Sequence, residues 1–367
     1  MPKINKVVTT VWYNKKNMYS LRRVFPKAQF VYVDFYDKEK LSEEVKDADV
    51  CILLGDVDNC ILGENTLKWI HCDHAGLNGS ARPEVFARGI PVTGAAGRSA
   101  PVLAEHAIYF MLQSCYHTRD LLRAQDECRW GVEGSEKWRG LYGRTAGIVG
   151  LGHTGKMLCE RLRALGMEII TYNRSEVAGF DYAKKLTAQK GDSLDELLEC
   201  SDFVILTVAL TDATFHLIGK EAFEIIKKGA FLVNISRGGV VDTDALIEAL
   251  SDGTLSGAGL DVFEEQPLSA DSPLWRMPNV YITPHVTPQV PDRQAASIEI
   301  IRENARRFEA DEPLMNLMRE SDAVSGGKAE GGWARLMNSN LPKEEIEKLP
   351  LEKFLGARGW KDPSEWM

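Results

Sequence analysis

The sequence predicts an α/β protein made of two domains, each built on a parallel β-sheet. Short apolar runs alternate with charged, helix-like segments through the first hundred residues, and a second such alternation starts near residue 145. Short buried strands separated by helices are typical of a parallel sheet covered on both faces. A chain of 367 residues has room for two domains of ordinary size.

The first alternation predicts five strands, which we expect at residues 6–12, 29–34, 49–54, 67–72 and 89–93. A charged helix is expected at 37–47, between two of these strands. A longer helix is expected at 101–124, because Pro101 lies near its start, where helices tolerate proline.

The second alternation predicts six strands, which we expect at residues 145–150, 168–172, 203–208, 231–235, 257–262 and 280–283. Helical patterns lie at 155–165 and 244–251. One more amphipathic helix, expected at 292–310, ends the main body of the chain.

Composition and charge narrow the class of protein. The formal net charge is −9, with 44% hydrophobic and 26% charged residues, which is ordinary globular composition. An acidic chain without a basic run is a poor binder of nucleic acid or of an anionic membrane, and we expect neither as a partner. The seven cysteines are odd in number and none is spaced as CxxC, so we expect reduced thiols, no metal site and a cytoplasmic protein.

A glycine pattern, Gly150-x-Gly152-x-x-Gly155, lies between a predicted strand and a predicted helix. Gly150 permits a tight turn, Gly152 lets the backbone approach a pyrophosphate, and Gly155 lets the helix pack closely on the strand. His153 and Thr154 lie at the helix N-terminus, whose N–H groups face the phosphates in such sites. The pattern predicts a dinucleotide site; the alternative is a glycine-rich turn without a ligand.

The second strand of this unit ends at Asn173, which is followed by Arg174 and Ser175. A site for NAD usually has an acidic residue here, which binds the ribose hydroxyls and would repel a 2′-phosphate. Arg174 can pair with a phosphate and Ser175 can donate to it. We therefore expect NADP(H), with NAD(H) possible; in the alternative, Arg174 only covers the adenine as an exposed side chain.

Two further residues suit hydride chemistry on a 2-keto acid. Arg237 follows one apolar strand and His285 follows another. Ligands of an open parallel sheet bind beyond the carboxyl ends of the strands, so both side chains are expected near the glycine turn. An arginine can clamp the carboxylate while a histidine passes a proton to the carbonyl oxygen.

With these motifs the chain resembles the D-isomer-specific 2-hydroxyacid dehydrogenase family. The resemblance covers roughly residues 45–318. It rests on Ala104-Glu105-His106, the glycine turn, Asn234-Ile-Ser-Arg237-Gly238 with Asp242, Leu260-Asp261-Val262 with Pro267, and Thr283-Pro284-His285.

The resemblance implies two Rossmann-like or flavodoxin-like domains with the active site in the cleft between them. Residues 1–101 and 288–318 would form the substrate domain, with a C-terminal helix that returns to it, and residues 102–287 the dinucleotide-binding domain. Residues 319–367 would be a C-terminal extension. A homodimer and a small 2-keto or 2-hydroxy acid are the implied partners.

Roles are carried over by position. Arg237 matches the substrate-binding arginine, His285 the acid/base histidine, and Asp261 the residue that faces the nicotinamide amide. Ser236 and Thr207 fall in loops that line the cofactor. The loop whose backbone N–H groups would hold the substrate carboxylate is His74-Ala75-Gly76-Leu77.

One position departs from the family pattern. The usual catalytic glutamate precedes the proline of the Asp-Val segment, and here that residue is Gln266. A glutamine can orient His285 but supplies no charge, so we expect His285 to be less basic than is usual in the family. Formate dehydrogenases of the superfamily resemble the chain in this glutamine, but their substrate-holding asparagine is matched by Ser99.

Several residues keep two interpretations. His74 is either an extra donor to a second polar group on the substrate or a side chain turned to solvent or bonded to backbone. Arg98 and Ser99 either lie near the substrate or cap the following helix. We expect His106 to be structural.

The sequence therefore predicts an NADP(H)-preferring reductase that converts a small 2-keto acid to the D-hydroxy acid. Arg237, with the backbone of residues 75–77, would hold the substrate, and His285, oriented by Gln266, would donate the proton. A nucleotide-binding regulator with weak or no catalysis is the alternative, favoured by Gln266 and by the unusual C-terminal segment.

That segment begins with a glycine-rich linker at 325–332 and contains Trp333, Trp360 and Trp366. Three tryptophans are too many for a plain disordered tail, so we expect part of it to dock on the body or on a neighbouring subunit. A place at the active-site entrance is the alternative.

Overall fold

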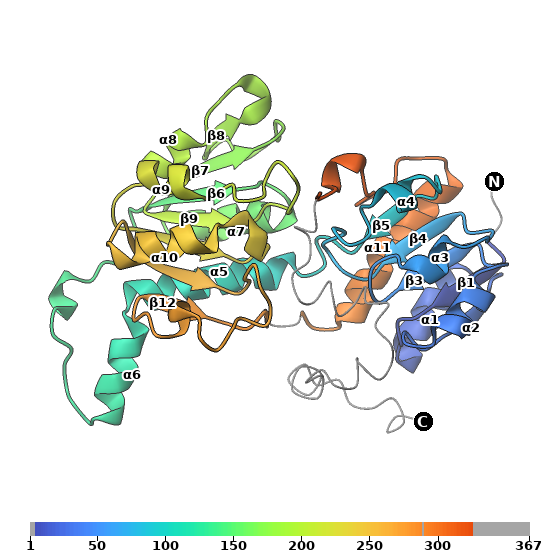
Figure 1. Cartoon of the computed structure of the whole chain (residues 1–367), viewed down its shortest axis with the longest axis horizontal. Coiled ribbons are helices and arrows are strands. Elements are labelled where there is room, and N and C mark those ends of the chain that lie inside the picture. Colours follow the sequence, from blue (N-terminus) through green and yellow to red (C-terminus); the bar gives the residue numbers. More distant parts are fainter. Residues whose placement is uncertain (1–3, 288–289, 326–367) are drawn as a thin grey trace. The chain divides into compact units, whose positions relative to one another are not determined.

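The computed structural model describes residues 4–287 and 290–325, which form two compact units (Figure 1). The first unit contains residues 4–94 and 301–318, and the second contains the described residues from 95 to 300 and from 319 to 325. The units therefore divide at 94/95 and 300/301, whereas the expected domain boundaries lie at 101/102 and 287/288. The expected extension is described only as far as residue 325.

The first unit has a five-stranded parallel sheet in the order β2-β1-β3-β4-β5. Its strands are β1 (Lys6–Thr9), β2 (Gln29–Tyr32), β3 (Val50–Leu53), β4 (Trp69–Cys72) and β5 (Val92–Gly94). Its helices are α1 (Lys15–Val24), α2 (Lys38–Glu44), α3 (Asn59–Leu62) and α4 (Pro83–Phe86), together with the later part of α11 (Arg293–Glu309). This strand order is that of flavodoxin-like folds.

The central strands of this unit are buried because both faces of the sheet are covered. All four residues of β3 and all four of β4 are buried, so neither strand shows a polar face. Helix α1, in contrast, is largely charged and starts where the Asn14 side chain accepts a hydrogen bond from the backbone N–H of Asn17. Its charge explains why the sequence pattern did not identify it as part of a core.

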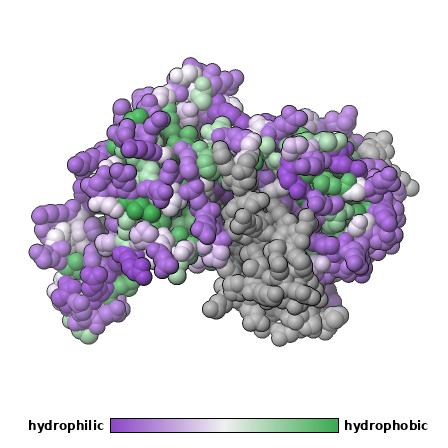
Figure 2. Space-filling view, in the orientation of Figure 1, coloured by the Kyte–Doolittle hydropathy of each residue, from purple (hydrophilic) through white to green (hydrophobic). Residues whose placement is uncertain are grey.

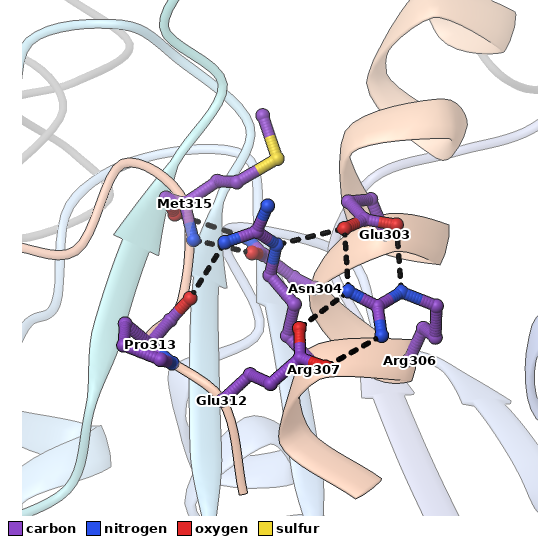
Figure 3. Close-up of polar contacts among 7 residues, drawn as sticks. All are labelled: Glu303, Asn304, Arg306, Arg307, Glu312, Pro313 and Met315. Carbon is purple, nitrogen blue, oxygen red and sulfur yellow. Dashed lines mark hydrogen bonds and ion pairs between the residues drawn. The ribbon is translucent and has the colours of Figure 1, made fainter. Parts of the chain in front are cut away.

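The end of α11 and the segment after it complete the first unit (Figure 3). Asn304 accepts from the Met315 N–H at 2.7 Å and donates to the Met315 carbonyl oxygen at 3.1 Å. The Met318 N–H then donates to Val92 at 2.8 Å, which places the segment beside β5. The edge of the sheet is thereby covered.

The second unit has a seven-stranded parallel sheet in the order β12-β11-β10-β9-β6-β7-β8. Its strands are β6 (Thr145–Val149), β7 (Glu168–Asn173), β8 (Lys184–Thr187), β9 (Phe203–Leu206), β10 (Ala230–Asn234), β11 (Leu255–Leu260) and β12 (Val280–Ile282). Its helices are α5 (Ala100–Cys115), α6 (Thr118–Asp126), α7 (His153–Ala164), α8 (Asp195–Cys200), α9 (Lys220–Ile225) and α10 (Thr243–Ser251), with the start of α11.

Alternate residues of these strands enter two separate cores. On β9, Phe203 and Ile205 pack with α5 and α7, whereas Val204 and Leu206 pack with α8, α9 and α10. Successive side chains of a strand point to opposite faces, so a central strand buried on both faces is apolar throughout.

The order of the strands reverses at β6. Chain order runs outward from β6 through β7 to β8 on one side and through β9 to β12 on the other. In open parallel sheets, ligands bind beyond the carboxyl ends of the strands at this reversal. The residues that follow β6 and β9 are therefore the first place to look for a ligand site.

Two further differences from the expected elements lie in the second unit. The helix expected at 101–124 is two helices, α5 and α6, because His117 between them has a left-handed backbone (φ 43°, ψ 53°) and its ring stacks on Trp138. Strand β8, with the sequence Lys-Lys-Leu-Thr, was not expected, since only its last two residues are buried.

Candidate active site

The glycine turn follows β6 and leads directly into α7. Gly150 has a φ of 102°, a conformation that L side chains rarely adopt, and a Cβ on Gly155 would lie 2.1 Å from the Gly150 carbonyl oxygen. Gly152, in contrast, has no atom within 4 Å of a would-be Cβ. The turn is thus tight on its inner side and open at Gly152.

The open position is also the N-terminus of a long helix. Gly152 is the N-cap of α7, which has 12 residues, and it offers no side chain to the first N–H groups of that helix. An uncapped helix N-terminus beside an open backbone position fits a bound phosphate. This arrangement fits the dinucleotide predicted from the sequence, with His153 and Thr154 in the first turn of α7.

Thr207 and Asn173 hold the turn from two sides. The Thr207 hydroxyl donates to the carbonyl oxygen of Gly150 at 2.6 Å. The Asn173 side chain accepts from the Leu151 N–H at 3.1 Å and donates to the Ser175 carbonyl oxygen at 2.7 Å. Arg174 and Ser175 are exposed at the end of β7. Asn173 therefore braces the phosphate-binding turn itself.

Arg237 lies in a turn that Asn234 organises after β10. Asn234 accepts from the N–H and the hydroxyl of Ser236, at 3.0 and 2.8 Å, and donates to the Arg237 carbonyl oxygen at 3.0 Å. A Cβ on Gly238 would lie 1.9 Å from the backbone of Phe263, so this turn packs directly against the segment that leads to Gln266. The role of Asn234 was not expected from the sequence, although it belongs to the Asn-Ile-Ser-Arg motif.

His285 follows β12 and contacts Gln266. Its Nδ1 atom lies 2.9 Å from Oε1 of Gln266, whose Nε2 donates to the Phe263 carbonyl oxygen at 3.0 Å. Because the amide nitrogen is committed to Phe263, the amide oxygen faces the imidazole and accepts, so Nδ1 carries the hydrogen. The other ring nitrogen, Nε2, is then the one that can exchange a proton.

The backbone of His285 is strained and anchored. Its φ is 54°, and its N–H donates to the carbonyl oxygen of Asp261 at 2.9 Å. A positive φ in a residue other than glycine is uncommon and persists where neighbouring bonds determine it. Strain of this kind is characteristic of functional sites.

Asp261 is almost completely buried, with 1% of its surface exposed, and its carboxylate binds the segment around His285. It accepts from the hydroxyls of Thr283 and Thr287 at 2.6 and 3.0 Å and from the Val286 N–H at 3.0 Å. Burial raises the pKa of Asp261 against the lowering effect of these bonds. The two threonines were not expected from the sequence.

Glu264, two residues before Gln266, contacts residues other than His285. Glu264 accepts from the Thr243 N–H at 2.9 Å and lies 2.6 Å from Nε2 of His216. Glu264 is therefore committed to a structural contact, and Gln266 is the side chain of this segment that contacts His285.

The loop predicted to hold a substrate carboxylate follows β4 in the first unit. A Cβ on Gly94 would lie 2.9 Å from the His74 carbonyl oxygen, so β5 supports the loop closely. Nε2 of His74 lies 3.8 Å from the Asp56 carboxylate, which also accepts from the Ser80 hydroxyl at 2.6 Å. The remaining residues of this loop are Ala75, Gly76 and Leu77.

Arg98 and Ser99 precede α5. Arg98 is 8% exposed and donates to the Ser297 hydroxyl at 2.8 Å. Ser99 occupies the N-cap position of α5, but its side chain makes no capping hydrogen bond. Side-chain capping of α5, one of the two interpretations, is therefore not found for Ser99.

Together, a glycine turn at a strand reversal and a strained histidine held by a glutamine are typical of a dinucleotide-dependent enzyme of the doubly wound α/β class. Residues 108–287 match the model of the D-isomer specific 2-hydroxyacid dehydrogenase NAD-binding domain. The chain belongs to the D-isomer specific 2-hydroxyacid dehydrogenase family.

Relatives of known name agree with this membership. A glyoxylate reductase of Pyrococcus furiosus is 36% identical over 284 residues, which cover 75% of this chain and 83% of the relative. A glyoxylate reductase of Korarchaeum cryptofilum is 34% identical over 293 residues, covering 77% and 86%. A crystal structure of a D-isomer specific 2-hydroxyacid dehydrogenase from Xanthobacter autotrophicus, in complex with NADPH and MES, is 26% identical with a TM-score of 0.72, and the match covers 86% of this chain and 98% of that one.

The described residues were compared with the requirements of a metal site and of a membrane-spanning helix. Among residues 4–287 and 290–325, no group of three or more histidine, cysteine or acidic side chains is arranged to hold a metal ion. No helix in that part of the chain is both long and apolar enough to cross a membrane. On the face shown in Figure 2 the surface is mostly hydrophilic.

Proposed function

We propose that the chain is an NADP(H)-preferring reductase that converts a small 2-keto acid to the D-2-hydroxy acid. The observation that carries this proposal is the contact between Nδ1 of His285 and Oε1 of Gln266, since it orients the imidazole and supports Nε2 as the nitrogen that exchanges a proton. The glyoxylate reductases among the relatives support a small 2-keto acid as substrate.

The cofactor would lie on the glycine turn. Gly150, Gly152 and Gly155 with the first turn of α7 would bind the pyrophosphate, and Thr207, Ser236 and Asp261 would flank the nicotinamide half. When bound, the nicotinamide supplies a hydride to the substrate carbonyl carbon. Arg174 and Ser175, both exposed at the end of β7, would bind a 2′-phosphate, which favours NADP(H) over NAD(H).

The substrate would be bound by two groups of donors. Arg237 would pair with the carboxylate, and the backbone N–H groups of residues 75–77 in the first unit would bind carboxylate and carbonyl oxygens. His285 would donate its Nε2 proton to the carbonyl oxygen as the alkoxide forms, while Gln266 keeps the ring oriented. The first unit is thus proposed to bind substrate, with His74, Arg98 and Ser99 as further candidates for contact, and the second unit to bind cofactor.

A homodimer in a reducing compartment such as the cytoplasm is part of this proposal. Helix α6 and the segment after it stand away from the sheet of the second unit (Figure 1). Along α5, α6 and this segment, Trp130, Tyr142, Tyr116 and Leu122 are exposed by 104, 84, 55 and 54%. Large exposed apolar side chains favour a protein partner, here a second copy of the chain. All seven cysteines are free thiols, in keeping with a reducing environment.

Turnover of the purified protein tests the activity. Nicotinamide absorbance would be followed with NADPH and with NADH against glyoxylate, hydroxypyruvate, pyruvate, phenylpyruvate and oxaloacetate. Saturable oxidation of NADPH that His285→Gln abolishes supports the reductase. Tight binding of NADPH with no turnover on any of these acids supports instead a nucleotide-binding regulator, an alternative that the uncharged Gln266 at Nδ1 of His285 favours.

A further inference from the structure

Behind His285, the side chains of His106, Thr283, Asp261 and Thr287 form a closed ring. The Thr283 hydroxyl, which donates to Oδ1 of Asp261, lies 3.1 Å from Nε2 of His106. The Thr287 hydroxyl, which donates to Oδ2 of Asp261, lies 3.0 Å from Nδ1 of His106. The two hydroxyls therefore connect both nitrogens of one imidazole to both oxygens of one carboxylate.

The packing of α5 on the sheet brings His106 to this place. Gly259 lies two residues before Asp261 on β11, and a Cβ there would lie 2.4 Å from the side chain of Phe110. The absence of a side chain at Gly259 lets α5 lie close to the strand. The His106 ring, one helical turn before Phe110, stacks on it with centroids 4.7 Å apart and reaches the residues around Asp261.

The number of hydrogens that the ring needs can be counted. It contains four contacts, and each needs one hydrogen between its two heavy atoms. The two threonine hydroxyls supply two. A neutral His106 with an ionised Asp261 supplies only one more, which leaves one contact between two acceptors. All four contacts are made only when the pair of His106 and Asp261 carries one further proton, on either residue.

Burial acts on both residues of the pair. It lowers the pKa of His106, because the charged imidazolium loses its hydration, and it raises the pKa of Asp261, because the buried carboxylate does so too. The two shifts bring the proton affinities of the imidazole and the carboxylate closer together, so the further proton is shared between the two residues.

The same carboxylate holds the chain around His285. Besides its two threonines, Asp261 binds the Val286 N–H through Oδ1 and the His285 N–H through its backbone oxygen. We propose that His106 is a positioning residue for His285. It closes a ring of four side chains that retains one proton, and this ring holds residues 283–287 in place, with His285 in its strained backbone conformation. This inference deepens the proposed reductase activity and rests on it for its catalytic consequence.

The ionisable groups around the ring are few. Within the described residues, two adjoin it: His285, three residues after β12, whose backbone N–H donates to the Asp261 carbonyl oxygen, and Tyr109 on α5, whose ring centroid lies 6.0 Å from that of His106. Glu105, next to His106 in the chain, lies instead 3.9 Å from Arg161. The proton of the ring is thus shared mainly between His106 and Asp261.

Removal of one threonine hydroxyl tests the count of hydrogens in the ring. In Thr287→Val two contacts remain, and the hydroxyl hydrogen of Thr283 with the one hydrogen of a neutral His106 satisfies both. We expect the folded variant to lose the shared proton at a lower pH than the wild type. Thr287→Ser keeps the hydroxyl and should behave as the wild type, and Thr171→Val, at a buried threonine of β7 outside the ring, is the matched control for the change of side chain.

The measurement is the stability of the full chain between pH 6 and 10. Above the pKa of a free histidine the unfolded pair has no further proton. If the four contacts retain one in the folded ring, as the count requires, folding takes up a proton and stability falls as pH rises. We expect this fall to extend to higher pH in the wild type, Thr287→Ser and Thr171→Val than in Thr287→Val. The count is overturned if Thr287→Val and Thr287→Ser have the same pH dependence.

The effect on His285 is measured separately. The imidazole resonances of His285, assigned with His285→Gln, should respond in the wild type when the ring loses its proton, and in Thr287→Val at the correspondingly lower pH. The alkaline limb of kcat for 2-keto acid reduction should move in the same direction, with a smaller change in KM for NADPH. If the His285 resonances do not change when the ring loses its proton, in the wild type or in Thr287→Val, the positioning role is refuted.

These readouts keep the two proposals distinct. If no 2-keto acid is turned over, the reductase proposal fails, but stability and the His285 resonances still decide the ring. If turnover is found and Thr287→Val leaves both the pH dependence of stability and the pH profile unchanged, the ring fails and the reductase stands.

Discussion

Nδ1 of His285 lies 2.9 Å from the amide oxygen of Gln266, at the position where the family's usual residue is a glutamate. An amide oxygen orients the ring as a carboxylate oxygen does, because both accept the Nδ1 hydrogen. The amide carries no charge, however, so it stabilises an imidazolium less. The geometry of the acid/base group is thus kept while its electrostatic support is reduced.

The first prediction concerns the charge at this contact. In Gln266→Glu we expect His285 to retain its proton to higher pH, because an adjacent carboxylate favours the charged ring. Reduction needs the protonated ring, so the alkaline limb of the rate profile should move to higher pH, and so should the NMR titration of His285. Glu265→Gln, in the same segment, is the control. An unmoved NMR titration would show that residue 266 does not couple to His285.

A second prediction separates the two functions of the glycine turn. Gly152→Ala places a Cβ in open space, so we expect a change in stability within about ±0.5 kcal/mol but a clear loss of affinity for NADPH. Gly155→Ala forces a Cβ to 2.1 Å from the Gly150 carbonyl oxygen, and we expect a loss of about 1–3 kcal/mol from overpacking. Thermal unfolding and titration with NADPH measure both. Equal destabilisation by the two changes would contradict this division.

The third prediction concerns the choice of cofactor. Arg174→Ala should weaken binding of NADPH by about 1.5–3 kcal/mol, the usual contribution of a hydrogen bond to a charged group, or roughly 10- to 150-fold. The KM for NADH should change little. Arg163→Ala removes the same charge from a residue whose guanidinium lies 4.3 Å from the Tyr182 ring centroid, and it should affect neither cofactor. A parallel loss of NADPH and NADH binding in Arg174→Ala would indicate adenine covering instead.

The sequence predicts the strands well because their signal is local. Residues 203–206 are apolar throughout since both faces of β9 are buried, and the expected strand at 203–208 contains them. The break at His117 has no such signal, because neither glycine nor proline marks it and the turn is stabilised by stacking on a residue 21 positions away. Its position depends on tertiary packing.

The site is predictable to the same extent. Gln266 is identified by its place before Pro267, and the structure shows it in contact with His285. The ring through Thr283 and Thr287 cannot be identified from the sequence in this way, since His106 reaches it from a helix more than 150 residues earlier in the chain. Likewise, the bond from Arg98 to Ser297 spans 199 residues, and no spacing rule predicts it.

The last prediction concerns acid stability of the first unit, where Glu303 accepts from two arginines (Figure 3). Its bonds to Arg306 and Arg307, at 2.9 and 2.8 Å, lower the pKa of Glu303 to about 2. A depressed carboxyl pKa contributes stability that is present above the ordinary glutamate pKa and is lost as pH falls toward the folded value. Wild-type stability should therefore decline between about pH 4.5 and 2 partly through this group.

Glu303→Gln replaces the titrating carboxyl group with an amide that is neutral at every pH. We expect a slightly lower midpoint of urea unfolding at pH 6, where Glu303 is ionised in the wild type, and a difference from wild type that shrinks as the pH is lowered. The effect is small because the side chains of this network are exposed to solvent. Glu309→Gln, at an exposed residue of the same helix, is the matched control and should show a pH-independent offset. A difference between Glu303→Gln and wild type that grows on acidification would contradict the assigned direction of the shift.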